Sequence, residues 1–517
     1  MIAKGEPAMR RLEEAAIVLA TSLALAGCAT SALDMAPARA DRPWTPATTA
    51  SREIIAGTPG TSDAAKGYVL PADPSLAGVP PPPVVDPKKT YALADLIDLA
   101  ESNNPNTRIA WNNARKAALT AGIAESAFLP QIAISAVRGY QASSGQDSVA
   151  GVGANTTSTA RGGVAAISMQ WLLFDFGERA ALVDAATQAS VISNIAFTAA
   201  HQDVIYAVSI AFYAHSAARR RLATSTQSLK NAESVEAAAQ DRRNHGIGTV
   251  IEVAQASHGA AQARLAVVQA TGGAQNAYLA LLGAMGVSPL TKIRIADASS
   301  RRLSPGLTAP VDKVVSEAIA RRPDVQAAYA ARKASLAGVQ AAQAEFLPKL
   351  FVSATGTYNS GDLSLTALPS TGQEAPTVNV SGSHYGGTIL AGVTMPLYDG
   401  GSRLALLEKA QAEADSAEAR MARVRQDAVR EIVLADNALH TSLAAIGAAQ
   451  ALASAAQTTF DAALAAYRNG VGSITDATLA QTQLLQAKNA STDAASVALS
   501  AAATLALSTG ALGAAPP

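Results

Sequence analysis

The sequence predicts an α+β membrane protein built from two copies of one helix–strand–strand–helix unit. Three observations lead to this prediction. The body of the chain is duplicated, long proline-free stretches show helical periodicity, and shorter stretches of alternating apolar residues lie between them. Two copies supply four strands per chain, which are too few to close a barrel.

The duplication rests on four landmarks that recur in the same order. Pro105 and Pro323 are 218 residues apart, whereas Asp175 and Asp399 are 224 apart. The full set pairs Asn104-Pro105-Asn106 with Arg322-Pro323-Asp324, Phe128-Leu129-Pro130 with Phe346-Leu347-Pro348, Leu173-Phe174-Asp175-Phe176-Gly177 with Leu397-Tyr398-Asp399-Gly400-Gly401, and Gly246-Ile247-Gly248 with Gly470-Val471-Gly472. The change of offset predicts a six-residue insertion in the second copy. We place the repeats at residues 91–300 and 301–512.

Each copy also predicts a long helical hairpin. About 67 residues without proline separate Asp-x-Gly from Gly-x-Gly, enough for a helix roughly 100 Å long. A packed stripe is expected at Val204, Val208 and Ala211 and at Val424, Ala428, Ile432, Ala435 and Leu439. A second alanine-rich helix follows each Gly-x-Gly, at residues 249–285 and 473–508, so the glycines must reverse the chain.

Between Leu-Pro and Asp-x-Gly the apolar period changes to 2, which predicts strands. The apolar positions are Ala165, Ile167, Met169, Trp171 and Leu173 in the first copy and Leu350, Val352, Ala354, Tyr358, Tyr385, Ile389, Ala391, Val393, Met395 and Leu397 in the second. These faces match the length of transmembrane strands. Residues 141–161 and 360–384 are rich in Gly, Ser, Thr and Asn, and we expect exposed loops there.

We expect no apolar stretch beyond the amino terminus to reach the roughly 18 residues of a spanning helix. Strands would then have to cross the membrane, and oligomerisation would close the sheet, because an open edge is prohibitive in lipid. A soluble β-hairpin packed on helices is the alternative.

The amino terminus predicts an export signal at residues 1–27. Lys4, Arg10 and Arg11 precede an apolar run, which ends in Leu25-Ala26-Gly27-Cys28. This ending resembles a lipoprotein lipobox, so Cys28 is the predicted lipidation site; an incidental cysteine in an ordinary signal is the alternative. Cys28 is the only cysteine, which excludes a disulfide within the chain. Residues 28–90 read as an extended segment rich in Pro and Ala.

Composition argues against several functional classes. The chain of 517 residues has a net charge of +0 and only 15% charged residues, so nucleic-acid binding is not expected. The sequence contains no Gly-x-x-x-x-Gly-Lys, Gly-x-Ser-x-Gly or His-Glu-x-x-His motif, and the spacing of His201 and His215 does not suit a metal. Turn formation explains Asp175 and Asp399. We therefore predict neither an enzyme nor a bound cofactor or metal.

From about Tyr91 to Leu512 the landmarks together resemble the TolC family of outer-membrane efflux proteins. The hairpin turns contribute to the resemblance, with residues 243–248 reading Arg-Asn-His-Gly-Ile-Gly and residues 467–472 reading Tyr-Arg-Asn-Gly-Val-Gly. The resemblance implies a homotrimer whose strands form one 12-stranded β-barrel and whose helices form a periplasmic α-barrel. It also implies a periplasmic adaptor, an inner-membrane transporter, and location in the outer membrane; with Cys28, it suggests the lipid-anchored branch of the family.

For such a protein we expect export of small molecules by a tripartite efflux pump. Two alternatives stay open. One is the outer-membrane duct of a type I protein-secretion system, and the other is a structural coiled-coil lipoprotein of the periplasm. The alternating apolar strands argue against the second alternative.

Candidate functional residues lie at the two hairpin turns. Glu252 and Asp476 follow Thr249 and Ser473 in Ser/Thr-x-x-acid patterns, which are typical of helix capping. In a trimer the same carboxylates would form a charged ring at the periplasmic gate. We also expect Gly246, Gly248, Gly470 and Gly472 to form the turns, and the resemblance adds contact with the adaptor.

Overall fold

A computed structural model describes residues 35–37, 40–41, 44, 46–57, 68–78, 85–149, 152–297, 311–361 and 384–513. The chain divides into two compact units, Met1–Pro82 and Pro83–Pro517. In the first unit, β1 (Ala47–Thr48) pairs antiparallel with β2 (Ile54–Ile55), and a short helix η2 spans Pro74–Leu76. Cys28 and the predicted signal at residues 1–27 lie outside the described residues.

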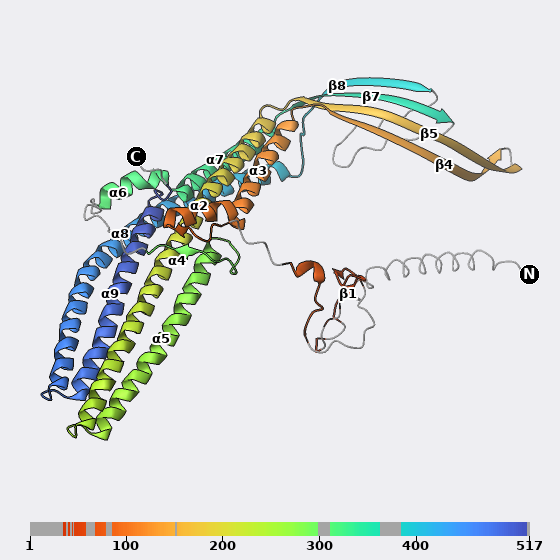
Figure 1. Cartoon of the computed structure of the whole chain (residues 1–517). Helices are drawn as coiled ribbons and strands as arrows, with labels where there is room; N and C mark the ends of the chain where they lie inside the picture. The colour runs from red at the N-terminus through yellow and green to blue at the C-terminus, as the bar shows by residue number, and fades with distance from the viewer. Residues whose placement is uncertain are drawn as a thin grey trace, which may run out of the picture. The chain divides into compact units, whose positions relative to one another are not determined.

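The second unit confirms the duplication element by element (Figure 1). Equivalent helices have equal lengths of 22, 67 and 35 residues. They are α3 (Pro105–Ser126) and α7 (Pro323–Ala344), α4 (Glu178–Asn244) and α8 (Ser402–Arg468), and α5 (Val250–Ala284) and α9 (Ile474–Ser508). Shorter elements precede the first helix of each copy. They are β3 (Thr90–Tyr91) and α2 (Leu93–Asn103) before α3, and β6 (Arg294–Ile295), α6 (Val311–Ala318) and η5 (Ile319–Arg321) before α7.

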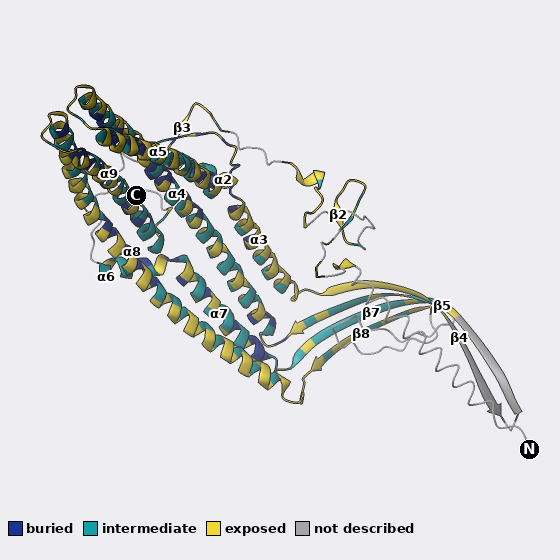
Figure 2. Cartoon of the chain, turned by 90° about the horizontal axis from the view of Figure 1, so that it is seen from below, coloured by how far each residue is buried: buried dark blue, intermediate teal, exposed yellow. Residues whose placement is uncertain are grey.

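The helices pack through small residues. Helices α3, α4, α7 and α8 contact one another in that order, and α4 also packs against α5 and α9. The predicted stripe is buried at Val204 and Val208 and at Ala428, Ile432, Ala435 and Leu439, and it is partly buried at Ala211 and Val424. Figure 2 shows the buried parts of the helices in dark blue. One core cluster joins both hairpins and includes Val235, Ala256, Phe460 and Leu484.

The expectation about spanning helices was wrong. Helices α4, α8 and α9 each contain an 18-residue window of mean hydropathy 1.3, and by length and composition alone each could cross a membrane. Alanine explains the discrepancy, because it raises mean hydropathy while presenting little apolar surface. Within the single chain, only 22%, 28% and 17% of the three windows is buried.

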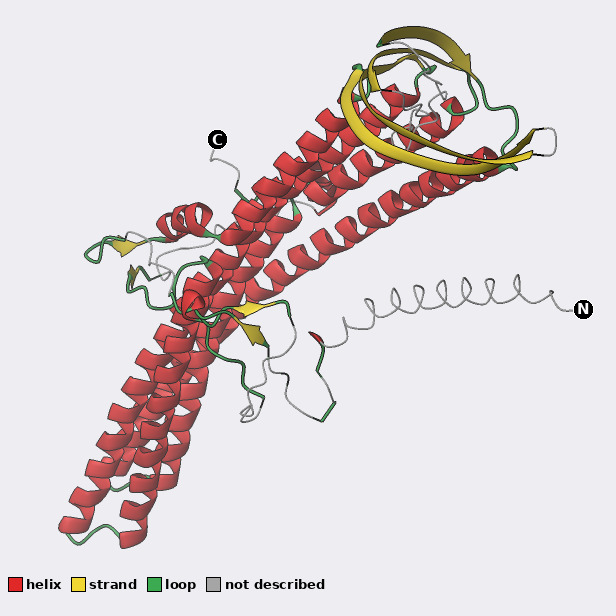
Figure 3. Cartoon of the chain, turned by 90° about the vertical axis from the view of Figure 1, so that its right-hand side faces the viewer, coloured by secondary structure: helices red, strands yellow, loops and turns green. Residues whose placement is uncertain are grey.

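The four strands form one antiparallel sheet in the order β4-β5-β7-β8 (Figure 1). Figure 3 shows this curved sheet at one end of the long helices. Their bounds are Gln131–Val149, Val152–Phe174, Lys349–Gly361 and Tyr385–Thr394. The pairing register brings apolar residues from all four strands onto one face: Ile132, Ile134, Ala136, Ala165, Ile167, Met169, Val352, Ala354, Ile389, Ala391 and Val393. The opposite face carries Ser135, Ser168, Ser353, Thr355 and Thr388.

Two details of the strand prediction need correction. Residues 141–149 and 152–161 are not loops, since β4 and β5 remain paired to Val149 and Val152; their backbone groups are satisfied by the ladder although the side chains are polar. Strand β8 ends at Thr394, so Met395 and Leu397 lie beyond it.

The predicted insertion is confirmed. The pairs Gln131↔Gln170 and Lys349↔Thr394 are equivalent under the two offsets, as are Tyr140↔Arg161 and Tyr358↔Tyr385. The extra six residues therefore lie between Tyr358 and Tyr385, a stretch that includes residues outside the described ones.

Each strand-to-helix junction is held by an arginine. Asp175 accepts hydrogen bonds from the backbone N–H of Arg179 at 3.0 Å and from its Nε at 2.6 Å. Arg179 also donates from Nη1 to the carbonyl oxygens of Ala127 and Leu172, and it lies 4.7 Å from the Phe128 ring centroid. The two landmarks Phe-Leu-Pro and Asp-x-Gly thus meet at one point of the fold.

The second copy repeats this arrangement. Arg403 donates to Asp399 at 2.8 Å and lies 5.3 Å from the Phe346 ring centroid. Asp399 also accepts from the backbone N–H of Gly401 and Arg403, which confirms its predicted role in the turn.

Candidate functional site at the hairpin turns

The predicted turn glycines are required by the backbone. Gly246 and Gly470 both have φ +78, in the left-handed region. Gly248 and Gly472 are instead limited by space. A Cβ on Gly248 would lie 2.8 Å from the backbone nitrogen of Arg243, and one on Gly472 would lie 3.0 Å from the Ala466 Cβ. Both hairpins therefore have the same tight turn.

The two carboxylates serve their helix ends differently. In the first hairpin, Glu252 accepts from the Thr249 backbone N–H at 2.8 Å while Thr249 Oγ1 accepts from that of Glu252, so the capping box is complete. In the second, Ser473 Oγ accepts from the Asp476 backbone N–H and donates to Asp476 Oδ2 at 2.7 Å. The aspartate is one methylene shorter, and its carboxylate is bound by a hydroxyl rather than by the backbone. Capping is thus confirmed for both turns. The Asp476 carboxylate differs from that of Glu252 because it accepts no hydrogen bond from the backbone of its cap residue.

Arg242 connects the two hairpins. It donates from Nη1 to the Tyr467 carbonyl oxygen at 3.2 Å and from Nη2 to that of Ile247 at 3.3 Å. Its guanidinium lies 5.1 Å from the Tyr467 ring centroid, within the range of a cation–π contact. A residue of the first hairpin is thereby fixed to the last turn of α8.

Tyr467 is fully buried at this contact. Burial raises the pKa of its hydroxyl, the nearby Glu252 carboxylate raises it further, and Arg242 opposes both. The hydroxyl oxygen is buried with no hydrogen-bond partner among the described residues. The phenol therefore stays neutral at physiological pH, and the arginine carries the only charge of the pair.

Sequence reasoning missed Arg242 and gave Tyr467 no role of its own. A signal was present, because the repeat places Ala466 where the first copy has Arg242, and Tyr467 where it has Arg243. The two turn sequences differ at the positions of Arg242 and Tyr467, whose side chains contact each other, whereas the glycines that they share only form the turns.

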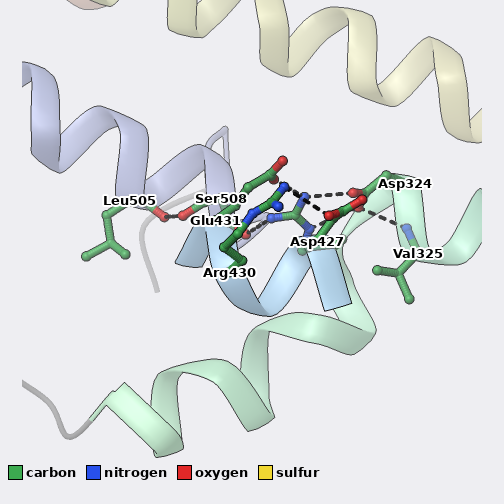
Figure 4. Close-up of polar contacts among 8 residues, drawn as sticks. Asp324, Val325, Asp427, Arg430, Glu431, Leu505 and Ser508 are labelled. Carbon is green, nitrogen blue, oxygen red and sulfur yellow. Dashed lines mark hydrogen bonds and ion pairs between the residues drawn. The ribbon is translucent and has the colours of Figure 1, made fainter. Parts of the chain in front are cut away.

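A second asymmetric cluster lies where α4, α7, α8 and α9 meet, beside a cavity of 520 Å³. The buried Arg322 donates to Asp324 at 2.7 Å, to Glu431 at 2.6 Å, and to the Ser508 carbonyl oxygen at 2.8 Å. Figure 4 shows Asp324, Glu431 and Ser508 of this cluster. Hydrogen bonds to both carboxylates raise the pKa of Arg322, although burial opposes them.

The first copy has a neutral version of this cluster. Asn104, equivalent to Arg322, donates to the Ala284 carbonyl oxygen at 3.1 Å, and Ala284 is the repeat equivalent of Ser508. Both side chains therefore bind the end of the returning helix. The charged part is specific to the second copy.

The comparisons with known proteins agree with this architecture. A sequence model described as outer membrane efflux protein matches residues 96–287 and 314–511. Protein CyaE of Bordetella pertussis is 28% identical over 375 residues, covering 71% of this chain and 72% of that protein. Outer membrane protein OprJ of Pseudomonas aeruginosa is 29% identical over 303 residues, covering 57% and 59%.

Solved structures show the same fold. The outer membrane protein VceC from Vibrio cholerae gives a TM-score of 0.66 at 21% identity, with 81% of this chain and 96% of that one covered. CusC gives a TM-score of 0.67 at 19% identity, with 81% and 91% covered. The TolC-like fold predicted from the sequence is therefore confirmed, and it is a fold of channels rather than of enzymes.

Proposed function

Because the chain belongs to the outer membrane efflux protein family, we propose that it is the outer-membrane duct through which a tripartite pump exports small molecules. Three copies would contribute twelve strands to one barrel and continue it with a helical tunnel. A periplasmic adaptor and an inner-membrane transporter would complete the pump, and the transporter would supply the energy.

The observation that carries this proposal is the apolar face of the sheet. Ile134, Ile167 and Ile389 lie on it and are 80%, 51% and 79% exposed in the single chain. A continuous apolar surface with side chains this exposed is unfavourable in water, and it suits contact with lipid. The opposite, hydroxyl-rich face suits a water-filled lumen. In a periplasmic scaffold this apolar face would be exposed to water, which argues against that alternative.

At the other end we propose that the hairpin turns form the gate. Asp476 and Glu252 would ring the mouth of the tunnel, where a single sign of charge favours cations. Gly246, Gly248, Gly470 and Gly472 would present the turn backbone to the adaptor. Lipidation of Cys28 would anchor the chain to the outer membrane.

Purified protein in planar bilayers tests the proposal. We expect discrete conductance steps, together with an oligomer that migrates faster before boiling than its mass predicts. A preparation that stays monomeric and never conducts would remove the channel function. Co-purification with a proton-driven transporter would favour efflux, whereas an ATP-driven transporter that exports a protein would favour the secretion alternative.

A further inference from the structure

Two arginines lie at one end of the apolar face of the sheet. Arg138 is opposite Gly163 and two residues from Ala136, and Arg161 is opposite Tyr140. Since side chains alternate between the two faces of a strand, both arginines project from the same face as Ala136. From Ala136 toward the helices, the positions of this face on the four strands carry no charged side chain. The positive charge is therefore confined to the end of the sheet that is far from the helices.

Tyrosines accompany the arginines at this end. Tyr358 and Tyr385 lie opposite each other on the apolar face, with their ring centroids 5.0 Å apart. Tyr140, Tyr358 and Tyr385 are 59%, 43% and 79% exposed. Tyrosine is enriched where a bilayer meets water, because its ring is apolar and its hydroxyl is polar. This end of the face thus has the composition of a membrane interface.

The opposite end of the face has an aromatic residue of its own, Trp171. Its side chain is 38% exposed and donates from Nε1 to the Phe128 carbonyl oxygen at 2.8 Å. From Arg161 to Trp171, strand β5 advances by about 34 Å along its axis. With the usual tilt of a barrel strand, this length spans about 25 Å of bilayer, which is the height of the apolar band of a transmembrane barrel. When the band lies in lipid, the arginines are level with the headgroups.

The guanidinium groups have hydrogen-bond donors to spare. Both arginines are exposed, and neither forms an ion pair with a described residue. Arg161 lies 5.2 Å from the Tyr140 ring centroid, a cation–π contact that leaves its N–H groups available. Diagonal neighbours on paired strands are about 7–8 Å apart, so the two long side chains can converge on one anion.

The space between the arginines is open because Gly163 has no side chain. A Cβ on Gly163 would lie 3.8 Å from Arg138 Cγ and 3.4 Å from Ser360 Oγ. Ser360, the partner of Gly163 on β7, donates from Oγ to the Gly163 carbonyl oxygen at 3.3 Å. The glycine therefore forms the floor of a shallow site, with guanidinium groups on one side and a hydroxyl on the other.

The chemistry of this site matches a phosphate that carries an apolar tail. Arginine binds phosphate oxygens in a bidentate manner, and two arginines can neutralise one phosphate. A small soluble anion would contact the arginines alone. A lipid would place its phosphate between them and lay its acyl chains along the adjoining apolar residues, such as Ile134 and Ile167.

We propose that Arg138 and Arg161 bind the phosphate of an anionic lipid headgroup at the end of the apolar face that is far from the helices. Tyr140 orients Arg161, and Gly163 leaves room for the phosphate. This site rests on the proposed function, because only a sheet within a bilayer presents this face to lipid. It gives the sheet a preference for the charge of the lipid in addition to its apolar contact.

A lipid titration of the full-length protein in an uncharged detergent tests the site, with thermal unfolding as the measurement. We expect phosphatidylglycerol to stabilise the protein at lower concentrations than phosphatidylcholine, which has no net charge. Arg138→Gln with Arg161→Gln should raise the half-maximal concentration of phosphatidylglycerol about 30-fold, since each arginine near anionic lipid contributes about fivefold. The difference between the two lipids should then disappear.

Arg420→Gln with Arg423→Gln is the matched control, because it removes the same charge from exposed positions on α8 and should leave the titration unchanged. Equal losses in the two double variants would overturn the proposal, as would equal stabilisation of the unmodified protein by both lipids. Equal stabilisation by inorganic phosphate would indicate a site for a free anion and would also overturn it. An unmodified protein that conducts but shows no lipid preference would reject only this site, whereas a protein that never conducts would reject the proposed function.

Discussion

At the scale of single residues, Arg179 holds the strand-to-helix junction through a buried ion pair. Burial raises the pKa of Asp175, but hydrogen bonds from Arg179 outweigh it, so the net pKa is lowered. A lowered folded pKa means that the ionised form stabilises the fold above the unfolded pKa of about 3.9, and that this contribution is lost as the pH falls below it. The junction should therefore weaken only below about pH 4.

We expect Arg179→Met to destabilise the protein by about 3–5 kcal/mol, because it leaves the Asp175 carboxylate buried and unpaired. Arg403→Met is the matched control. Its partner Asp399 is more exposed, with 28% of the side chain accessible against 5% for Asp175, so the loss should be smaller. Thermal unfolding in detergent measures both. Equal losses would show that burial does not decide the strength of the junction.

Arg242 suggests that the hairpins are fixed to each other at their tips. We expect Arg242→Ala to increase the conductance or the open time in planar bilayers. It removes the hydrogen bond to the Tyr467 carbonyl oxygen, worth about 1.5–3 kcal/mol for a charged donor, and the cation–π contact with the Tyr467 ring. The exposed Arg243 is the control: Arg243→Ala removes the same charge one residue away. If both variants behave alike, charge and not the hairpin contact controls opening.

Of the two carboxylates at the hairpin turns, that of Asp476 is bound by the Ser473 hydroxyl, whereas that of Glu252 is bound by a backbone N–H. We expect Asp476→Ala to raise the conductance or to weaken block by divalent cations, since the ring would lose half of its carboxylates. Asp476→Asn keeps the shape and a hydrogen-bonding group, so it separates charge from capping. Unchanged conductance and block in an intact oligomer would leave Asp476 with the capping role alone.

At the scale of elements, the sequence predicted helices better than the ends of strands. The 67-residue helices and their turns follow from proline-free periodicity and from glycines at fixed positions, which are local signals. Residues 141–149 and 152–161 were misassigned because Ser, Thr, Gly and Asn are common in loops, whereas here the two segments pair with each other as strands. Arg242 was missed because its contact with Tyr467 joins residues 225 positions apart.

The turn glycines allow a test at this scale. We expect Gly248→Ala to destabilise its hairpin by more than about 1 kcal/mol, because the new Cβ would overlap the Arg243 backbone, which cannot move independently of the helix. Gly272→Ala, within α5 and with open space around it, should be neutral or stabilising by up to about 1 kcal/mol. Limited proteolysis at the turn compares the two. Equal proteolysis would indicate that the turn has room for a side chain.

At the scale of the whole molecule, the duplication explains which features repeat and which differ. Equal helices, turns and strand registers place equivalent groups at equivalent positions in the two copies. One difference lies where the first copy meets the second, at Arg242 with Tyr467, and another lies within the second copy, at Arg322 with Glu431. The contact between the copies therefore depends on a difference between them, because the repeat equivalents of Arg242 and Tyr467 are Ala466 and Arg243.

The sheet gives the decisive test of what surrounds the protein. We expect Ile389→Arg to impair insertion into lipid vesicles by about 2–4 kcal/mol, the cost of an arginine on the lipid face near the middle of a bilayer. Thr388→Arg adds the same side chain to the same strand one residue away, on the hydroxyl-rich face, where water would solvate it. Insertion followed by protease protection should therefore be normal for Thr388→Arg and reduced for Ile389→Arg. If insertion were instead normal for Ile389→Arg and reduced for Thr388→Arg, the apolar face would line the lumen, and the proposed water-filled duct would be wrong.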